Sequence, residues 1–270
     1  MDSRPIGVFD SGVGGLTVFR EISRALPGEP LLYLGDSARV PYGTKSPETI
    51  QRYAREAAYF LLERDVKMLV VACNTATAAA LPILERELSI PVIGVVEPGA
   101  RAAVSVTKGR VGVIATEGTV RSRAYTRAIH AIDGSVEVIE QPCPLFVALA
   151  EEGWAGTNVA REVAEVYLAP LLREKIDTLV LGCTHYPILR ATIAEVTGEG
   201  VTIVDSAETT ALAVEAALHD SAIRASESDP KYQFLVTDAT ERFLRIAETF
   251  LDHSVDHLDL VDIARDQPVG

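Results

Sequence analysis

Two cysteines stand at matching positions in two similar stretches of the sequence. Cys73 follows the apolar run 68–72, and Cys183 follows the apolar run 178–182, so the offset from 73 to 183 is 110 positions. In both stretches the cysteine precedes polar residues that can begin a helix, and a helix N-terminus stabilises a thiolate. Such a matched pair suits a reaction in which one group removes a proton and the other returns one on the opposite face.

Other interpretations of the cysteines are weaker. A lone cysteine at a strand end is most often a small buried side chain, but that reading does not account for a symmetric pair. The spacing Cys183-x-His185 is too tight for a usual zinc site and has no second ligand pair, so we expect no metal. Nothing indicates the oxidising setting that a disulfide needs. Cys143, between Pro142 and Pro144, has no counterpart in the other stretch, and we interpret it as structural.

Three further apolar runs recur in the same order around the two cysteines. Any α/β chain contains many such runs, so chance is the competing explanation, but a nearly constant offset favours a duplicated half-molecule. The pairs are 6–9 with 111–114 at an offset of 105, 91–95 with 201–205 at an offset of 110 and, more weakly, 31–34 with 136–139.

Short runs rich in Val, Ile and Leu alternate with longer amphipathic stretches along the whole chain. Because the runs are apolar on both faces, they predict parallel strands covered by helices. The predicted strands are 5–9, 31–34, 67–72, 91–95, 110–114, 136–140, 177–182, 201–205 and 232–237. The predicted helices are 16–26, 46–63, 75–89, 119–131, 157–173, 187–197, 206–218 and 239–250, with a further helical approach at 143–150.

This alternation predicts an α/β fold of two pseudo-symmetric doubly wound domains with mainly parallel sheets, and an active site in the cleft between them. We expect the first domain to comprise residues 1–97 plus 207–270 and the second to comprise 98–206. The segment after residue 206 is too small for a separate domain, so we expect it to pack back on the first one.

Composition excludes several classes of protein. The chain has 25 basic and 38 acidic residues and a net charge of −13, which repels phosphate backbones and argues against nucleic-acid or anionic-membrane binding. No run is long and apolar enough to cross a bilayer, and the N-terminus shows no signal pattern. Three cysteines are an odd and small number, typical of a reducing compartment. We therefore expect a cytoplasmic protein with no nucleic-acid or membrane partner.

The predicted carboxyl ends of the strands are rich in Ser, Thr, Asn and Gly and poor in Lys and Arg. Ligands of parallel α/β sheets bind at these ends, and backbone N–H groups with hydroxyls can hold a carboxylate without a salt bridge. The stretch 12–15 lacks the ending of a nucleotide P-loop and does not read G-x-G-x-x-G, so it does not favour nucleotide binding. The strand-end segments are 10–15, 35–37 with 41–43, 73–75, 116–119, 141–143 and 183–185.

Five ionisable side chains near these ends have open interpretations. His185 is a base, a hydrogen-bonding group at a helix start or a satisfied core residue, and its place two residues after a cysteine favours function. Asp10 and Asp36 are either turn formers or functional groups at neighbouring strand ends. Glu151 and Glu152 would ordinarily form a solvated helix end.

Several long motifs match bacterial glutamate racemases in order. The stretch 6–17 reads IGVFDSGVGGLT, 34–36 reads LGD and 41–43 reads PYG. The two cysteine segments read ACNTAT at 72–77 and LGCTHYP at 181–187. The chain therefore resembles the bacterial glutamate racemases of the aspartate/glutamate racemase family over nearly its whole length.

The resemblance implies a racemase that interconverts L- and D-glutamate without a cofactor and supplies D-glutamate for peptidoglycan. It implies two α/β domains related by pseudo-twofold symmetry, and we expect glutamate and a second copy of the chain, in a homodimer, as partners. The implied catalytic residues are Cys73 and Cys183 as acid/base thiols, Asp10 and His185 as their helpers, and Asp36 and Glu151 as polar supports, with Glu152 an alternative to Glu151. The implied substrate contacts are Asp10, Ser11, Tyr42, Gly43, Asn74, Thr75, Thr116, Thr119, Thr184 and His185.

Two other functions stay open from the residues alone. A related two-cysteine racemase acting on aspartate or a hydantoin would use the same thiols, although the motifs favour glutamate. A two-lobed protein that closes on an anionic metabolite would also explain the duplicated halves. Such proteins are usually exported, however, and they have no need of paired thiols.

Overall fold

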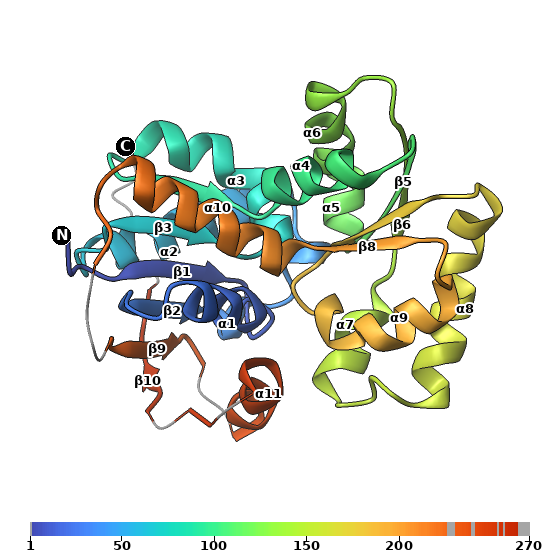
Figure 1. The fold of residues 1–270 in the computed structure, drawn as a ribbon. Coiled ribbons are helices and arrows are strands. Elements are labelled where there is room, and N and C mark those ends of the chain that lie inside the picture. The colour runs from blue at the N-terminus through green and yellow to red at the C-terminus, as the bar shows by residue number, and fades with distance from the viewer. Residues whose placement is uncertain (1, 226–229, 239–240, 253, 256, 264–270) are drawn as a thin grey trace.

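The computed structural model of the chain describes residues 2–225, 230–238, 241–252, 254–255 and 257–263. In this part of the chain the strands form two sheets, and all their pairings are parallel. The strands are β1 (Ile6–Asp10), β2 (Leu31–Gly35), β3 (Met68–Val71), β4 (Val92–Gly94), β5 (Arg110–Ala115), β6 (Glu137–Pro142), β7 (Thr178–Gly182), β8 (Thr202–Asp205), β9 (Tyr232–Val236) and β10 (Asp259–Leu260). Figure 1 shows them in two lobes, with β1, β2 and β3 in one and β5, β6 and β8 in the other.

The strand orders of the two sheets repeat one another. The first sheet has the order β10-β9-β2-β1-β3-β4 and the second has the order β6-β5-β7-β8. The second, first, third and fourth strands of each half therefore lie side by side in the same sequence. In this correspondence β1 of the first sheet is equivalent to β5 of the second, and β3 is equivalent to β7, as the sequence offsets predict. The repeated order confirms the pseudo-symmetric α/β fold.

Helices connect successive strands and cover the sheets. They are α1 (Leu16–Ala25), α2 (Pro47–Leu62), α3 (Asn74–Glu87), α4 (Val96–Val106), α5 (Glu117–Ser122), α6 (Ala124–Ile132), α7 (Leu145–Glu151), α8 (Asn158–Arg173), α9 (Arg190–Thr197), α10 (Ser206–Asp220) and α11 (Glu241–Leu251). Three short 3₁₀ segments, η1 (Ser37–Arg39), η2 (Tyr42–Thr44) and η3 (Tyr186–Leu189), lie in loops.

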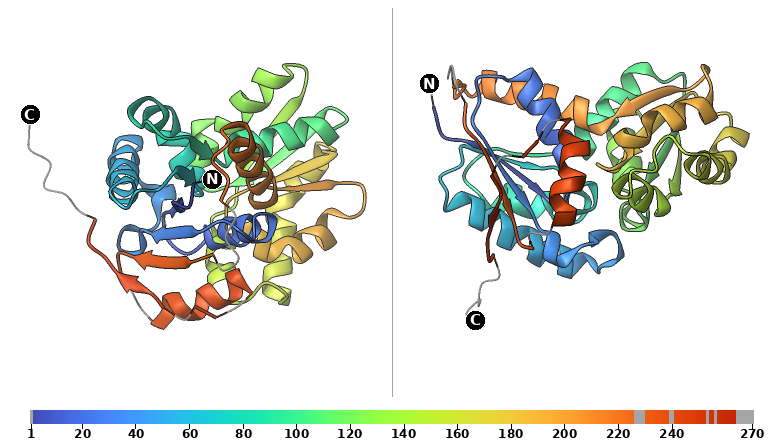
Figure 2. Two further views of the ribbon diagram at one scale, coloured as in Figure 1. Left: turned by 60° about the vertical axis from the view of Figure 1, so that its left-hand side comes forward. Right: turned by 90° about the horizontal axis from the view of Figure 1, so that it is seen from below.

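Burial explains why the strands are apolar on both faces. In β1, Ile6 and Val8 pack into one core cluster, which they share with Phe19 of α1. Phe9 points to a second cluster, which it shares with Ala57 of α2. Figure 2 shows helices on both faces of this sheet, so both sets of side chains leave water and stabilise the layers.

The C-terminal segment packs back on the first lobe, as predicted. Strand β9 pairs with β2, and both α10 and α11 pack against α1. A buried ion pair connects the C-terminal segment to the loops before β2 and β3. Lys67 Nζ lies 2.5 Å from Glu29 Oε2 and also donates to the carbonyl oxygens of Asp2 and Ile223. The other oxygen of Glu29 accepts the backbone N–H of Ala225 at 2.6 Å.

Some elements differ from the sequence predictions. The helix α4 was not predicted, because Pro98-Gly99 reads as a turn, although proline is tolerated in the first turn of a helix. The predicted helix 119–131 is two helices, α5 and α6, because Arg123 adopts a left-handed φ of 57° between them. The predicted helix 187–197 begins as η3, and β10 was not predicted. Of the predicted helix 239–250, residues 239–240 lie outside the described residues.

Among the described residues, none of the helices combines the length and the apolar composition that crossing a bilayer requires.

Candidate active site

The two cysteines occupy equivalent places in the two lobes and face one cavity. Cys73 follows β3 after a single residue, and Cys183 directly follows β7. Both thiols are buried, at 6% and 5% exposure, and both line a cavity of about 60 Å³ at the carboxyl ends of the strands. The cavity is lined by residues of both lobes, so the structure brings together side chains 110 positions apart.

Eleven of the residues predicted for the site line this cavity, and three lie behind its wall. The lining residues are Ser11, Tyr42, Gly43, Cys73, Asn74, Thr75, Thr116, Glu151, Cys183, Thr184 and His185. Asp10, Asp36 and Thr119 are fully buried and are not among them.

Five lining residues were not predicted from the sequence: Gly12, Val13, Val40, Pro41 and Val147. The first four belong to the two strand-end segments already singled out or directly precede one of them. Val147 lies one helical turn before Glu151 in α7, so the i, i+4 spacing of that helix was the signal that could have found it.

The first half-site is built around Cys73. Its Sγ caps α3 and accepts the backbone N–H of Ala76 at 3.4 Å. Burial and the charge of Asp10 raise the thiol pKa to about 12, against the opposing effect of hydrogen bonds from Ser11 and Ala76. Asp10 Oδ2 accepts the Gly12 N–H at 2.8 Å, while Oδ1 has no hydrogen-bond partner in the described part of the chain. Burial raises the pKa of this carboxyl as well.

The second half-site is built around Cys183 and a histidine. The Sγ of Cys183 lies 3.9 Å from His185 Nδ1, and His185 Nε2 lies 3.0 Å from Glu151 Oε1. Burial lowers the imidazole pKa, but the hydrogen bonds to Cys183 and Glu151 outweigh it and raise the pKa to about 10. Of the two adjacent glutamates, Glu151 contacts His185, and Glu152 is exposed. Phe250 of α11 packs edge-on against the imidazole, with 5.5 Å between ring centroids.

Neutral hydrogen-bonding groups form the rest of the polar wall. The hydroxyl of Thr75 lies 2.9 Å from that of Thr116 and 3.2 Å from that of Thr119. Thr75 lies in the first turn of α3, and Thr116 caps α5, so two helix N-termini converge there. Asn74 Oδ1 accepts the Tyr125 hydroxyl, while its buried Nδ2 has no partner among the described residues. The described lining residues include no Lys or Arg, so apart from His185 the donors that they offer to a carboxylate are neutral.

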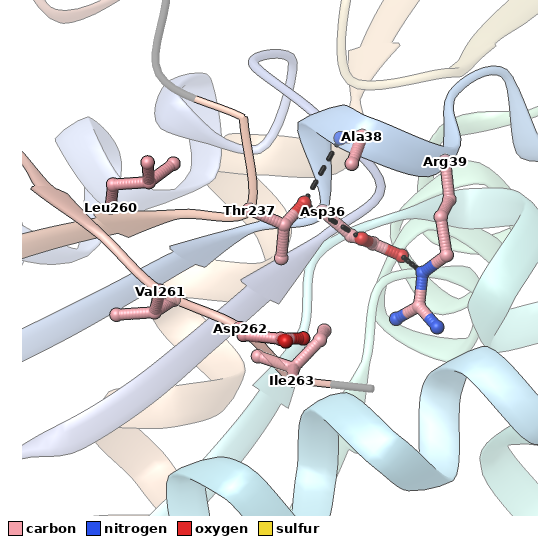
Figure 3. Close-up of a pocket in the computed structure, with 8 residues that line it drawn as sticks. All are labelled: Asp36, Ala38, Arg39, Thr237, Leu260, Val261, Asp262 and Ile263. Carbon is pink, nitrogen blue, oxygen red and sulfur yellow. Dashed lines mark hydrogen bonds and ion pairs between the residues drawn. The ribbon is translucent and has the colours of Figure 1, made fainter. Parts of the chain in front are cut away.

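Asp36 contacts the cavity through Tyr42 and not directly. Its Oδ2 accepts Arg39 Nε at 2.7 Å and the Tyr42 hydroxyl, and its Oδ1 accepts the Thr237 hydroxyl at 3.0 Å. Figure 3 shows Asp36 between Thr237 and Arg39, on the wall of a separate open pocket of about 490 Å³. Asp36 therefore fixes the side chain of Tyr42, and Tyr42 lines the cavity.

Close packing between the lobes leaves little room for a Cβ at two glycine positions. A Cβ on Gly14 would lie 2.4 Å from His185 Nδ1, and a Cβ on Gly43 would lie 3.0 Å from the Cβ of Thr116. The glycine-rich loop after β1 therefore packs directly against His185 of the other lobe. Within the described residues, no cluster of three or more His, Cys, Asp or Glu side chains could hold a metal ion.

Comparisons with known proteins agree on one family. The model of the Asp/Glu/hydantoin racemase family matches residues 6–215, and the chain belongs to this family. It is 55% identical to the glutamate racemase of Geobacter metallireducens over 253 residues, which cover 93% of this chain and 94% of that protein.

Solved structures show the same two-domain fold. Glutamate racemase isoform RacE1 from Bacillus anthracis has a TM-score of 0.94 and 46% identity, over 97% of this chain and 98% of that one. Glutamate racemase from Francisella tularensis, in complex with D-glutamate, has a TM-score of 0.92 and 40% identity, over 97% of this chain and 99% of that one.

Proposed function

We propose that this chain is a glutamate racemase, which interconverts L- and D-glutamate without a cofactor and supplies D-glutamate for peptidoglycan synthesis. The observation that carries the proposal is the pair of buried thiols, one from each lobe, on a single cavity. The glutamate racemases that the chain resembles support glutamate over aspartate or a hydantoin as the substrate.

The carboxylates of glutamate bind to the neutral donors of the cavity. These donors are the hydroxyls of Ser11, Thr75, Thr116 and Thr184, the Asn74 amide and the backbone N–H groups at the starts of α3 and α5. The Thr119 hydroxyl supports them from behind, because it lies within hydrogen-bonding distance of Thr75 and Thr116. Hydrogen bonds to a charged group are worth roughly 1.5–3 kcal/mol each, so a few of them replace a salt bridge. Fixed donors around the substrate also stabilise the negative charge that develops when the α-proton leaves.

The two thiols carry the proton transfers. The thiolate of one cysteine takes the α-proton of one enantiomer, and the thiol of the other donates its proton to the opposite face of the carbanion. One proton leaves Cα and one arrives, and the cysteines have then exchanged protonation states. The second cysteine is now the thiolate, which is the state that the other enantiomer requires.

Asp10 and His185 give the two half-sites different electrostatics. The pKa of about 12 keeps Cys73 a thiol before glutamate binds, and the α-ammonium group of glutamate brings the positive charge that favours its thiolate. Asp10, with a raised pKa and an unpartnered oxygen, is placed to accept a proton on this side. On the other side, the protonated imidazole of His185 favours the thiolate of Cys183, with Glu151 as its support and Asp36 acting through Tyr42.

The domain boundaries, assembly and location belong to the same proposal. We place the first domain at residues 1–97 plus 207–270 and the second at 98–206, in keeping with the two sheets. We propose a homodimer, which light scattering on the purified protein tests directly. Catalysis by free thiols favours a reducing, cytoplasmic setting.

The direct test is a racemisation assay with no added cofactor. The purified protein should convert either glutamate enantiomer to an equal mixture, and it should act more weakly on aspartate. Conversion of neither amino acid, with glutamate binding intact, would show that the chain is a binding protein instead.

A further inference from the structure

Tyr125 reaches from the second lobe to both cysteine segments. It stands at the start of α6 and is fully buried. Its ring packs against Gly182, the residue before Cys183, since a Cβ on that glycine would lie 2.9 Å from the ring. Its hydroxyl donates to Oδ1 of Asn74, the residue after Cys73, at 2.7 Å. One side chain thus contacts the cysteine segment of its own lobe and that of the other lobe.

The start of α1 makes the same arrangement in the opposite direction. Gly15, directly before α1, packs against Ala72, the residue before the first cysteine, and a Cβ on this glycine would lie 3.1 Å from the Cβ of Ala72. Two residues further on, Thr17 Oγ1 lies 2.9 Å from the carbonyl oxygen of Thr184, the residue after the second cysteine. The hydroxyl is also 2.9 Å from Gly14 O, and a carbonyl oxygen can accept two hydrogen bonds, so the single hydroxyl proton is shared between Thr184 O and Gly14 O.

Each hydroxyl fixes a group that faces the cavity. An amide side chain has a donor end and an acceptor end, which differ only in their partners. Because Tyr125 donates to Oδ1, the Nδ2 end of Asn74 is the end left to donate to a ligand, and it is buried without a partner in the described part of the chain. Thr17 in turn holds the backbone of the segment that carries Cys183 and His185.

We propose that Tyr125 and Thr17 are reciprocal positioning residues, each holding the segment that follows the cysteine of the opposite lobe. The proposal rests on the proposed function, because a two-thiol reaction needs both half-sites aligned on one Cα. Small misplacements of reacting groups are costly, and a hydrogen bond across the lobe junction from each side fixes their relative placement. Thr17 lies in α1, between β1 and β2, and Tyr125 lies in α6, between β5 and β6. The two hydrogen bonds therefore share the pseudo-symmetry of the thiols.

The test for Tyr125 is a double-mutant cycle with Asn74. Tyr125→Phe removes only the hydroxyl, and we expect kcat/KM to fall roughly 2- to 12-fold, the range that one hydrogen bond between neutral groups supports. The factor must be the same for both enantiomers, because the equilibrium constant between them is unity. In the Asn74→Ala background the same substitution should change kcat/KM less than about twofold, because the group it positions is gone.

The test for Thr17 uses a shape-matched substitution and its rescue. Thr17→Val keeps the volume and removes the hydroxyl, and Thr17→Ser restores it. We expect Thr17→Val to lower kcat roughly 3- to 30-fold, in the range of one buried hydrogen bond, and Thr17→Ser to recover most of it. Thr210→Val is the matched control, since Thr210 is equally buried but its hydroxyl donates within α10, to Ser206 O.

Three results would each overturn the positioning role. The first is additive losses of kcat/KM in the Tyr125–Asn74 cycle. The others are a kcat that Thr17→Ser does not recover and a loss of kcat in Thr210→Val equal to that in Thr17→Val. Calorimetric titration with glutamate repeats the Tyr125–Asn74 cycle with binding affinity, and not turnover, as the measured quantity. If the wild type binds glutamate and shows the coupling but does not racemise it, the proposed function fails and the positioning role stands. If it racemises glutamate and the cycle is additive, only the positioning role fails.

Discussion

Replacing Glu151 by Gln removes a negative charge from the hydrogen bond to His185 and keeps the size of the side chain. In the wild-type site the hydrogen bonds to Cys183 and Glu151 outweigh burial and raise the imidazole pKa from 6.5 to about 10. A hydrogen bond between charged groups is worth roughly 1.5–3 kcal/mol, which is about 1–2 pKa units at about 1.4 kcal/mol per unit. We therefore expect the His185 pKa in Glu151→Gln to fall to about 8–9.

The sign of the effect on turnover follows from the charge of the imidazole. Below its pKa His185 is cationic and favours the thiolate of Cys183. When the pKa falls, the cation is lost at a lower pH. The high-pH limb of kcat, in the direction that starts from this thiolate, should therefore move down by about 1–2 pH units. Stability follows the same sign: a raised pKa contributes stability that is complete below about 6.5 and is lost as the pH rises through the folded pKa.

NMR titration of histidine-labelled protein measures the pKa directly. The chain has 5 histidines, and the His185 signal is assigned by its loss in His185→Asn. Glu152→Gln is the matched control, because it removes the same charge from the neighbouring, exposed position. A wild-type His185 pKa near 6.5, or an equal shift in both glutamine variants, would refute the electrostatic reasoning.

Three further predictions address the binding wall, the lobe contact and the fold. Thr75→Ala should weaken glutamate binding by roughly 0.5–3 kcal/mol in calorimetry, because it removes one of three clustered hydroxyls; unchanged affinity, or an Arg or Lys on the bound α-carboxylate, would contradict this. Gly14→Ala should remove most turnover while the protein stays folded by circular dichroism, since the new Cβ would lie 2.4 Å from His185 Nδ1; near-normal kcat would show that the loop yields freely. Lys67→Met should lower the free energy of unfolding by roughly 3–5 kcal/mol in urea titration, because it leaves Glu29 buried and charged without its partner. A loss below about 1 kcal/mol, as for an exposed pair, would refute this account of the buried Lys67–Glu29 ion pair.

Much of the fold was predictable because its signals are local. The apolar runs gave all the strands except β10, which has only two residues. Ser46-Pro47 gave the start of α2, whose capping hydrogen bond, from the Thr49 N–H to Ser46 Oγ at 3.3 Å, is present. The helix α4 was missed because its first turn contains Pro98-Gly99. Gly99 packs there against Tyr125, a long-range contact that the local pattern does not contain.

The site was predictable where chemistry and strand ends coincide, and less so where the two lobes meet. The cysteines, His185 and the threonines stand directly after strands, and the structure gathers most of them on one cavity. The choice between Glu151 and Glu152 depends on the rotation of α7, which the sequence leaves open. The roles of Tyr125 and Thr17 depend on contacts between the lobes, and no spacing along the chain reports those.

Racemisation in deuterated water tests the two-thiol reaction most directly. The enzyme is given L-glutamate, the reaction is stopped early, and the deuterium at Cα of each enantiomer is measured by mass spectrometry after chiral separation; the experiment is then repeated from D-glutamate. Two thiols on opposite faces predict deuterium in the newly formed enantiomer and almost none in the remaining substrate, in both directions, because the donating thiol has already exchanged with solvent. Product that keeps the substrate's own proton, or equal labelling of both enantiomers from the start, would contradict the assignment of Cys73 and Cys183 to opposite faces of the substrate.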